Sequence, residues 1–376
     1  MSHEAVIAGV AQTTYTRRPE PDGTTAELLA EAILAAIADA GLEPGEVDGL
    51  GVSSFLLTPD RPIDLAWKLG LRLRWLMAEP LTLTIVQHAR RAIESGDARN
   101  IVIVGGDRMD SGRFREMVSR YNAVTEQRLV PMGLVGPNAQ FSLITAEHRR
   151  RHGLGPEAYG QVVVHQRARA ALHRNGIFTD PLTVEEYLAA PMVTSELRLY
   201  DCVPLVTGAG AVVLRRAGDA QGPAVRMAGY DSVLNHDHQE GDGLDLGLGP
   251  IAEQLGVQSG TDPTDVDLVS VYDDYPVIVL QQLQELGVLS EERLASLGET
   301  GFCEGLPVVN PSGGLLCCGQ AGVGGELHGF VDAVEQLTGK SGAGQIQGAR
   351  RALVTNYGMV LYRYGACAVA MLLEAA

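Results

Sequence analysis

Two patterns of apolar residues alternate along the chain. Short, almost fully apolar runs are typical of buried strands, and longer segments with apolar residues every three or four positions are typical of helices. The predicted strands are residues 5–11, 47–53, 101–106 and 208–214, then 224–229, 266–271, 351–355 and 367–373. The predicted helices are residues 25–40, 80–95, 158–172, 184–188, 244–255, 277–286 and 330–338. Strands and helices in this order predict a layered α/β fold.

The second half of the chain repeats the order of the first, and VDLVSV at 266–271 echoes VDGLGVS at 47–53. This repeat indicates an internal duplication, because its period of about 200 residues is too long for a solenoid. Two βαβαβ halves predict five layers, α-β-α-β-α. We place the first half at residues 1–217, with an arginine-rich insertion at about 107–182, and the second half at 218–376.

Charge and cysteine usage exclude several classes of function. The formal net charge of −17 argues against a nucleic-acid partner, although a local basic patch can still bind an anionic molecule such as coenzyme A. The five cysteines contain no C-x-x-C pair, so neither a zinc site nor a disulfide framework is indicated, and reduced thiols in the cytoplasm are expected. We expect no signal peptide, because MSHEAVIAGV lacks a basic region and a long apolar region, and no apolar run is long enough to cross a membrane.

Residues 310–325, NPSGGLLCCGQAGVGG, form the densest glycine cluster in the chain. Glycine is used where φ is positive or where a ligand approaches the backbone, and it weakens the interior of a helix or strand. The segment therefore predicts a loop, either one crowded with turns at the surface or one that binds a ligand.

This loop resembles the N-x-x-G-G-x-x-x-x-G-H-P motif of the thiolase superfamily. N-P-S-G-G is followed after four residues by Gly319, but Gln320 and Ala321 stand where thiolases have His-Pro. Residues 96–109, GDARNIVIVGGDRM, and 197–214, LRLYDCVPLVTGAGAVVL, also resemble segments of lipid-transfer-type thiolases. The resemblance extends over essentially the whole chain and implies the five-layer thiolase fold.

The residues that thiolases use for catalysis are replaced. Counting back from Gly96 places Glu79 at the position of the nucleophilic cysteine, where it could also be a helix-start carboxylate before Pro80 at the first helical position. Tyr272, which opens Y-D-D-Y after the strand at 266–271, takes the place of an active-site histidine. Asn356, in V-T-N-Y-G, takes the place of the second cysteine.

Without a thiol nucleophile, Claisen chemistry through an acyl-enzyme is hard to sustain, whereas a retro-aldol cleavage of a 3-hydroxyacyl-CoA needs only a base and an enolate site. The resemblance to thiolase-like aldolases that shorten steroid side chains implies this reaction. We expect Tyr272 as base, Asn310 as part of the enolate site, and Tyr357 or Tyr275 as proton donor, with Glu79 as a further candidate. The residues expected to contact the substrate are Gly313, Gly314, Gly319, Gln320, Asn356 and Gly358.

The same resemblance implies partners. It implies a homodimer, formed through the strand near Ile101, and a small acyl-CoA-binding partner protein with a zinc ribbon and an OB-fold. Coenzyme A is expected as part of the substrate, with no tightly bound cofactor and no metal. The His236-x-His238 pair has no fitting third ligand, so we interpret it as part of a polar loop.

Two alternatives stay open. The chain could be an acyltransferase that uses a relocated cysteine, for which Cys317 or Cys318 is the candidate, although both are also typical packing residues. Cys367 lies in an apolar strand and is more typical of a core residue. Alternatively, the chain could be a non-catalytic subunit that supports an active thiolase-like partner, since missing catalytic residues are expected there too.

Overall fold

The computed structural model describes residues 4–20, 22–57, 61–119, 123–238, 240–361 and 364–376. The strands are β1 (Ala5–Gln12), β2 (Gly49–Ser53), β3 (Trp75–Ala78), β4 (Asn100–Asp107), β5 (Gly208–Arg216), β6 (Val225–Leu234), β7 (Leu268–Ser270), β8 (Val308–Val309), β9 (Arg351–Leu361) and β10 (Tyr364–Ala375). The helices are α1 (Thr25–Asp39), α2 (Arg61–Lys68), α3 (Thr82–Ser95), α4 (Ser111–Ser119), α5 (Pro137–His152), α6 (Pro156–Ala170), α7 (Val184–Ala189), α8 (Leu248–Ser259), α9 (Pro276–Glu285), α10 (Glu291–Ser296), α11 (Gly314–Cys318) and α12 (Gly325–Thr338). Every strand and helix predicted from the apolar pattern is present, with ends that differ by a few residues.

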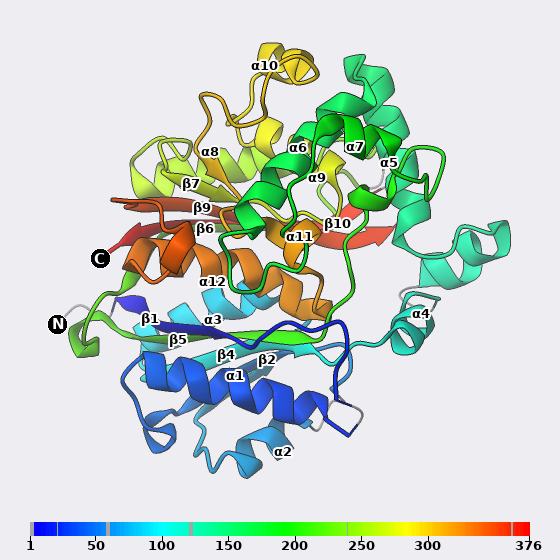
Figure 1. Ribbon diagram of the computed structural model, residues 1–376. Helices are drawn as coiled ribbons and strands as arrows, with labels where there is room; N and C mark the ends of the chain where they lie inside the picture. Colours follow the sequence, from blue (N-terminus) through cyan, green and yellow to red (C-terminus); the bar gives the residue numbers. More distant parts are fainter. Residues whose placement is uncertain (1–3, 21, 58–60, 120–122, 239, 362–363) are drawn as a thin grey trace.

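The strands form two sheets that lie one above the other in Figure 1. One has the order β3-β2-β4-β5-β1 and the other β6-β10-β9-β7-β8. A short antiparallel pairing of β1 with β6, in which Val6 faces Arg226 and Ile7 faces Val225, joins them into one ladder. Each sheet comes from one half of the chain, in agreement with the duplication seen in the sequence.

Helices cover the outer faces of both sheets and fill the space between them. Helices α3 and α12 lie between the sheets, α1 and α2 cover the first sheet, and α8 and α9 cover the second (Figure 1). The middle layer has an apolar core to which α3, α12 and both sheets contribute, including Ile85, Ile103, Phe330 and Met371, which are fully buried. The predicted five-layer α-β-α-β-α fold is confirmed.

The segment between β4 and β5 contains α4, α5, α6 and α7, and it leaves the first half to pack on the second (Figure 1). Helix α6 contacts α9 and α11, and α5 contacts α9. Its helices continue to α7, which lies beyond residue 182, the predicted end of the insertion. The predicted division into halves at residue 217 stays a prediction.

Two expectations need correction. The glycine segment is not only a loop, because it contains the short helix α11 and the start of α12. The strand near Ile101 is β4, which pairs with β2 on one side and β5 on the other, so it has no free edge for a second copy. The free edge of the first sheet belongs to β3, which the apolar pattern had not indicated.

None of the helices in the described part of the chain combines the length and the apolar character that crossing a bilayer requires.

Candidate active site

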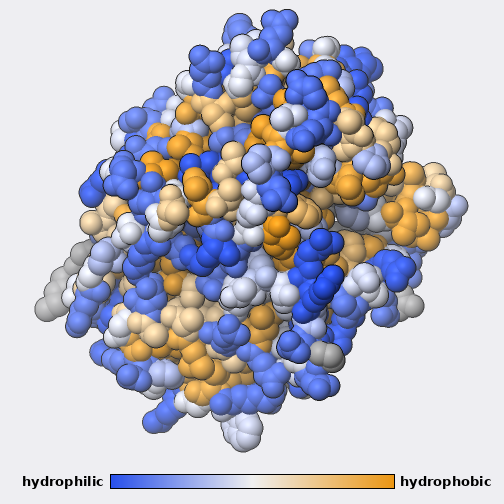
Figure 2. Space-filling view, in the orientation of Figure 1, coloured by the Kyte–Doolittle hydropathy of each residue, from blue (hydrophilic) through white to orange (hydrophobic). Residues whose placement is uncertain are grey.

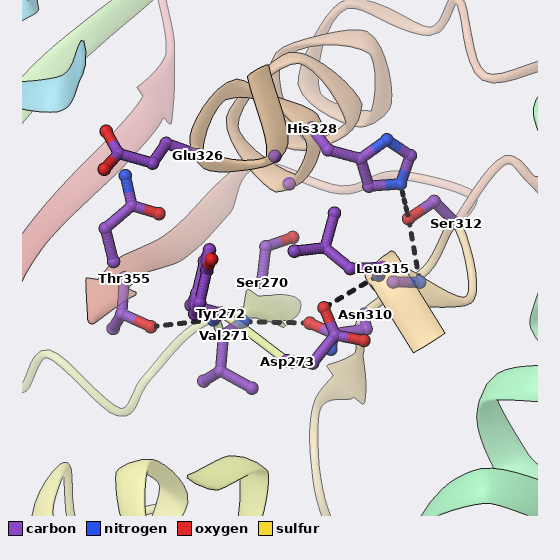
Figure 3. Close-up of a pocket in the computed structure, with 14 residues that line it drawn as sticks. Ser270, Val271, Tyr272, Asp273, Asn310, Ser312, Leu315, Glu326, His328 and Thr355 are labelled. Atoms are coloured by element: carbon purple, nitrogen blue, oxygen red, sulfur yellow. Dashed lines mark hydrogen bonds between the residues drawn. The ribbon is translucent and has the colours of Figure 1, made fainter. Parts of the chain in front are cut away.

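A small cavity lies where β7 ends, between the glycine segment and the first turn of α12 (Figure 3). Its volume is about 10 Å³, which is room for about one water molecule. The polar side chains that line it belong to Ser270, Tyr272, Asp273, Asn310, Ser312, Glu326, His328, Thr355 and Asn356. None of the described residues that line this cavity is a cysteine.

Two carboxamides offer unpartnered donors at this cavity. Asn310 adopts φ +45°, a left-handed conformation that asparagine tolerates, and its Oδ1 accepts a hydrogen bond from the backbone N–H of Val271 at 2.8 Å. This bond fixes the orientation of the amide, and Nδ2 is left buried without a partner. Nδ2 of Asn356, on β9, is also buried and unpartnered. Buried donors without partners are costly, so each of these two donors is suited to an oxygen of a ligand that carries negative charge.

Tyr272 stands directly after β7 with its hydroxyl held between two side chains. The hydroxyl donates to Oδ2 of Asp274 at 3.0 Å and accepts from Nε2 of Gln320 at 2.9 Å. Burial raises the pKa of Asp274 to about 7. A phenol that donates to a carboxylate and accepts from an amide can lose its proton to the carboxylate, and the amide then stabilises the phenolate. Gln320, which the motif resemblance aligns with the thiolase histidine, is the residue that donates to Tyr272.

Asp273 holds the glycine segment in place. Its carboxylate accepts from the backbone N–H groups of Leu315 and Leu316 at 2.8 and 3.1 Å, and from Nε2 of Gln166 on α6. Burial raises its pKa to about 8. A Cβ atom on Gly314 would lie 2.1 Å from Oδ2 of Asp273, so only glycine allows this approach. Asp273 was not among the residues that the sequence indicated.

The expected carboxylate at the start of α3 is present, but it is a different residue. The helix begins at Thr82 with Leu81 as N-cap, so the expected start at Pro80 is wrong, and Glu79 is exposed outside the cavity lining. Glu326, from α12, accepts from the backbone N–H of Thr82 at 2.6 Å. Burial raises the pKa of Glu326 to about 7, even though the helix N-terminus favours its charged form.

The other two candidate tyrosines lie away from the cavity lining. Tyr357 belongs to the core on the outer face of the second sheet, and burial raises its pKa. The hydroxyl of Tyr275 donates to Oδ1 of Asn138 at 2.5 Å, and its ring stacks on that of Phe141 at a centroid distance of 4.0 Å. The structure therefore brings Tyr272, Asn310, Asn356 and Gly314 to the cavity, but not Tyr357 or Tyr275.

Three further glycine candidates lie outside the cavity lining. Gly313 and Gly319 have φ of +90° and +100° and shape the ends of α11, and Gly358 is half-buried on β9.

The two cysteines proposed as relocated nucleophiles are buried, which disfavours the thiolate form that a nucleophile needs. Cys317 and Cys318 lie in α11, and burial raises the pKa of Cys317 to about 12 and that of Cys318 well above its usual value. The thiol of Cys303, outside the glycine segment, lies beside a histidine that could accept its proton. Sγ of Cys303 lies 2.6 Å from Nδ1 of His165, whose Nε2 lies 2.8 Å from the carbonyl oxygen of Val309. Burial still raises the pKa of Cys303 to about 11, so the thiol is the stable form.

Similarity to known proteins decides the family. Residues 249–370 match a family described as thiolase C-terminal domain-like. The 17-hydroxy-3-oxo-4-pregnene-20-carboxyl-CoA lyase of Mycobacterium tuberculosis is 30% identical over 382 residues, which cover 94% of this chain and 96% of that protein. This chain belongs to the thiolase superfamily. Within it, the chain groups with thiolase-like carbon–carbon lyases, as the sequence motifs predicted.

Two further relatives of the same thiolase-like type support this placement. The steroid side-chain-cleaving aldolase of Thermomonospora curvata is 29% identical over 364 residues, covering 90% of this chain and 91% of that protein. A solved structure titled Ltp2-ChsH2 aldolase superposes with a TM-score of 0.82 at 25% identity, over 99% of this chain and 98% of that one.

Proposed function

We propose that this chain cleaves a 3-hydroxyacyl-CoA by a retro-aldol reaction, giving a ketone or aldehyde and a shortened acyl-CoA. The observation that carries the proposal is the pair of unpartnered amide donors, on Asn310 and Asn356, in a cavity that Tyr272 also lines. The names of two relatives, a carboxyl-CoA lyase and a side-chain-cleaving aldolase, support the same reaction. They also favour, as substrate, a steroid with a hydroxyl at C17 and a side chain linked to CoA.

The proposed reaction begins with proton transfer from the C3 hydroxyl. Tyr272 takes this proton as its own proton passes to Asp274 across the 3.0 Å hydrogen bond. The electron pair of the O–H bond forms the new carbonyl at C3, and the C2–C3 bond breaks. The electrons of that bond move into the thioester to form an enolate, whose oxygen accepts from Nδ2 of Asn310 and Asn356. Protonation at C2 releases the shortened acyl-CoA and restores the carboxylate of Asp274.

The cavity holds only about one water molecule, so substrate entry requires the surrounding segments to move apart. We propose that an acyl-CoA-binding partner with a zinc ribbon and an OB-fold assists this step, since one solved relative is titled as a two-protein aldolase. The insertion offers a surface for it. Its projecting part, at the right of Figure 1, carries apolar patches in Figure 2, and Met132, Val135 and Leu143 are more than half exposed.

Coenzyme A enters this proposal only as part of the substrate. We also propose a cytoplasmic location, which the five free cysteines support because thiols persist in reducing compartments.

The test is mass spectrometry of the intact protein and of its products after incubation with acyl-CoAs. The panel contains acetyl-CoA, a branched 3-hydroxyacyl-CoA and a 17-hydroxysteroid 20-carboxyl-CoA, each with and without the zinc-ribbon partner. Release of a shorter acyl-CoA without a protein adduct supports the lyase. An acyl adduct on a cysteine, with Cys303 as the site to map first, would instead establish an acyltransferase. Neither adduct nor cleavage, in the presence of the partner, would favour a non-catalytic subunit.

The pH dependence of the cleavage should report on Asp274. Because Asp274 must be ionised to accept the proton of Tyr272, and burial raises its pKa to about 7, we expect kcat to rise with pH up to about 7 and then level off. Asp274→Asn should lower kcat and remove this acidic limb. Glu285→Gln is the matched control, since Glu285 also has a pKa raised to about 7 but lies outside the cavity lining. An acidic limb that persists in Asp274→Asn and disappears in Glu285→Gln would contradict the assignment.

We propose that two copies of the chain pair through the free edge of β3. Leu76 on this strand is 42% exposed, and Trp67 and Ile63 on the neighbouring α2 are 79% and 64% exposed. Leu76→Lys should convert a dimer into a monomer, because it places a charge on the apolar edge. Multi-angle light scattering after gel filtration measures this change. Leu34→Lys is the matched control, since Leu34 is also 42% exposed but lies on α1. A dimer that survives Leu76→Lys would place the interface elsewhere.

A further inference from the structure

Glu326 is a cavity-lining carboxyl group with one oxygen that the backbone does not occupy. It extends from the first turn of α12, and Figure 3 shows it at the other end of the cavity from Ser312. Its Oε2 accepts from the backbone N–H of Thr82 at 2.6 Å, and among the described residues no backbone donor reaches Oε1. Asp273, the other carboxyl group among the described lining residues, has both oxygens bonded to the backbone of α11. Glu326 is thus the lining carboxyl group that has an oxygen to offer to a substrate.

The other titratable side chains that line the cavity are already engaged. Tyr272 acts on the C3 hydroxyl in the proposed reaction. His328 has Nε2 2.9 Å from Oγ of Ser312 and Nδ1 3.3 Å from Nε2 of Gln12. Burial lowers the pKa of His328 well below its usual value, so the ring is neutral and is a weak acid. Among the titratable lining residues that the structure describes, Glu326 is therefore the one available for a further proton transfer.

We propose that Glu326 is the acid that protonates C2 of the enolate after the C2–C3 bond breaks. This assignment rests on the proposed retro-aldol function and adds a catalytic residue to it. The two carboxamides, on Asn310 and Asn356, bind the enolate oxygen and cannot perform this step, because a carboxamide is a far weaker acid than a carboxyl group. A carboxyl group that lines the same cavity can reach the carbon next to that oxygen.

The step is a single proton transfer. The electron pair of the C1–C2 double bond of the enolate takes the proton of Glu326 and forms the new C2–H bond, while the pair on the enolate oxygen restores the carbonyl of the thioester. Glu326 is left as a carboxylate, and the N-terminus of α3, which donates through Thr82, stabilises this charge. As Asp274 gives up the proton that it received from Tyr272, exchange through water protonates Glu326 for the next turnover.

The surroundings of Glu326 suit a group that changes its protonation state. Burial favours the neutral carboxylic acid, whereas the hydrogen bond from Thr82 favours the carboxylate. Burial is the stronger effect and raises the pKa to about 7, so both forms are populated near neutral pH. A carboxyl group in this state can donate a proton in one direction of a reaction and accept one in the other.

The test measures the exchange of hydrogen for deuterium at C2 of propionyl-CoA, with the full chain in D₂O, by mass spectrometry. Here the carboxylate of Glu326 would remove a proton from C2 to give the enolate, and a deuteron would return. No carbon–carbon bond breaks, so exchange is measured separately from cleavage. We expect the unaltered chain to catalyse the exchange, and Glu326→Gln to lower its rate by at least about 10²-fold. Glutamine keeps an oxygen that can accept from Thr82 but has no acidic proton.

Two further variants separate proton transfer from capping of α3. Glu326→Asp keeps a carboxyl group on a shorter side chain, so it should retain more exchange than Glu326→Gln, whereas a side chain that only caps the helix would give the reverse order. Glu285→Gln is the matched control. Glu285 also accepts from the first N–H of a helix, that of Leu248 at 2.8 Å, and has a pKa raised to about 7, but it lies outside the cavity lining. This variant should exchange at the normal rate.

The outcomes distinguish this assignment from the lyase reaction. If the unaltered chain exchanges C2 hydrogens but cleaves no 3-hydroxyacyl-CoA, and Glu326→Gln has lost the exchange, the lyase reaction is wrong and Glu326 is still the acid. Normal exchange by Glu326→Gln overturns the assignment, even where the chain cleaves its substrate. Absence of exchange by the unaltered chain also overturns it. Thermal unfolding checks the fold of each variant.

Discussion

Replacing Tyr272 by phenylalanine is expected to lower kcat for the cleavage of a 3-hydroxyacyl-CoA by about 10²- to 10⁴-fold. The change removes only the hydroxyl that bonds to Asp274 and Gln320, so the ring keeps its place at the end of β7. Because the hydroxyl acts on the reacting proton and not on the acyl chain, KM should change little. Steady-state kinetics, followed by release of the shortened acyl-CoA, measure both constants.

A matched control separates loss of the base from loss of a tyrosine in general. Tyr200 is also half-buried and carries the guanidinium of Arg167 5.2 Å above its ring, but it does not line the cavity. Tyr200→Phe should keep the activity of the unaltered chain. A fully active Tyr272→Phe would remove Tyr272 from the mechanism. In that case Tyr357→Phe and Tyr275→Phe, which alter the other predicted candidates, become the variants to measure.

The second large effect is expected from Asn310→Asp, which should lower kcat by about 10²- to 10³-fold. Aspartate keeps the oxygen that accepts from the N–H of Val271 and tolerates φ of +45°, so the loop should hold its shape. It replaces the donor Nδ2 by an oxygen, which cannot stabilise an enolate and repels one when ionised. Steady-state kinetics and thermal unfolding of the same sample separate the catalytic effect from a loss of stability.

Asn100→Asp provides the control for this change. Nδ2 of Asn100 donates to the carbonyl of Glu46 at 2.9 Å, far along the chain from the cavity residues and outside the cavity lining. This variant should cleave the substrate at the normal rate. If Asn310→Asp also keeps its rate, the enolate oxygen must be bound by other donors, and Asn356→Asp would then be decisive.

The fold was predictable because apolar periodicity reports burial directly. Strands such as β4 and β5 are buried on both faces and appear as continuous apolar runs. Helix α2 and strand β3 escaped detection because they are short and lie at the edge of the sheet, where half of their side chains are exposed. Helix α11 was not predicted because it begins with glycine, which has a weak helix propensity. The helix is stabilised by Asp273, a residue distant in sequence that accepts from its first N–H groups.

The candidate site was predictable only where a motif marked it. Tyr272 and Asn310 stand at motif positions of the thiolase superfamily, and the structure brings both to one cavity. Glu326 and His328 lie beyond the matched part of the loop motif, and their approach to α3 and to Ser312 depends on the packing of α12 between the sheets. Tyr357 was expected as a proton donor and adjoins Asn356 in the sequence, but neighbouring residues of a strand point to opposite faces.

The crossing of the insertion from one half to the other has an evolutionary consequence. Helix α6 belongs by sequence to the first half, yet its Gln166 donates to Asp273 of the second, while Glu326 of the second half caps α3 of the first. Each predicted half therefore depends on the other for one of its hydrogen-bond partners, so the two are not separable modules. A recombination between two relatives at the predicted boundary near residue 217 would join α6 from one parent to the glycine segment from the other. Substitutions in the insertion and in that segment should therefore have accumulated together, as compensating pairs.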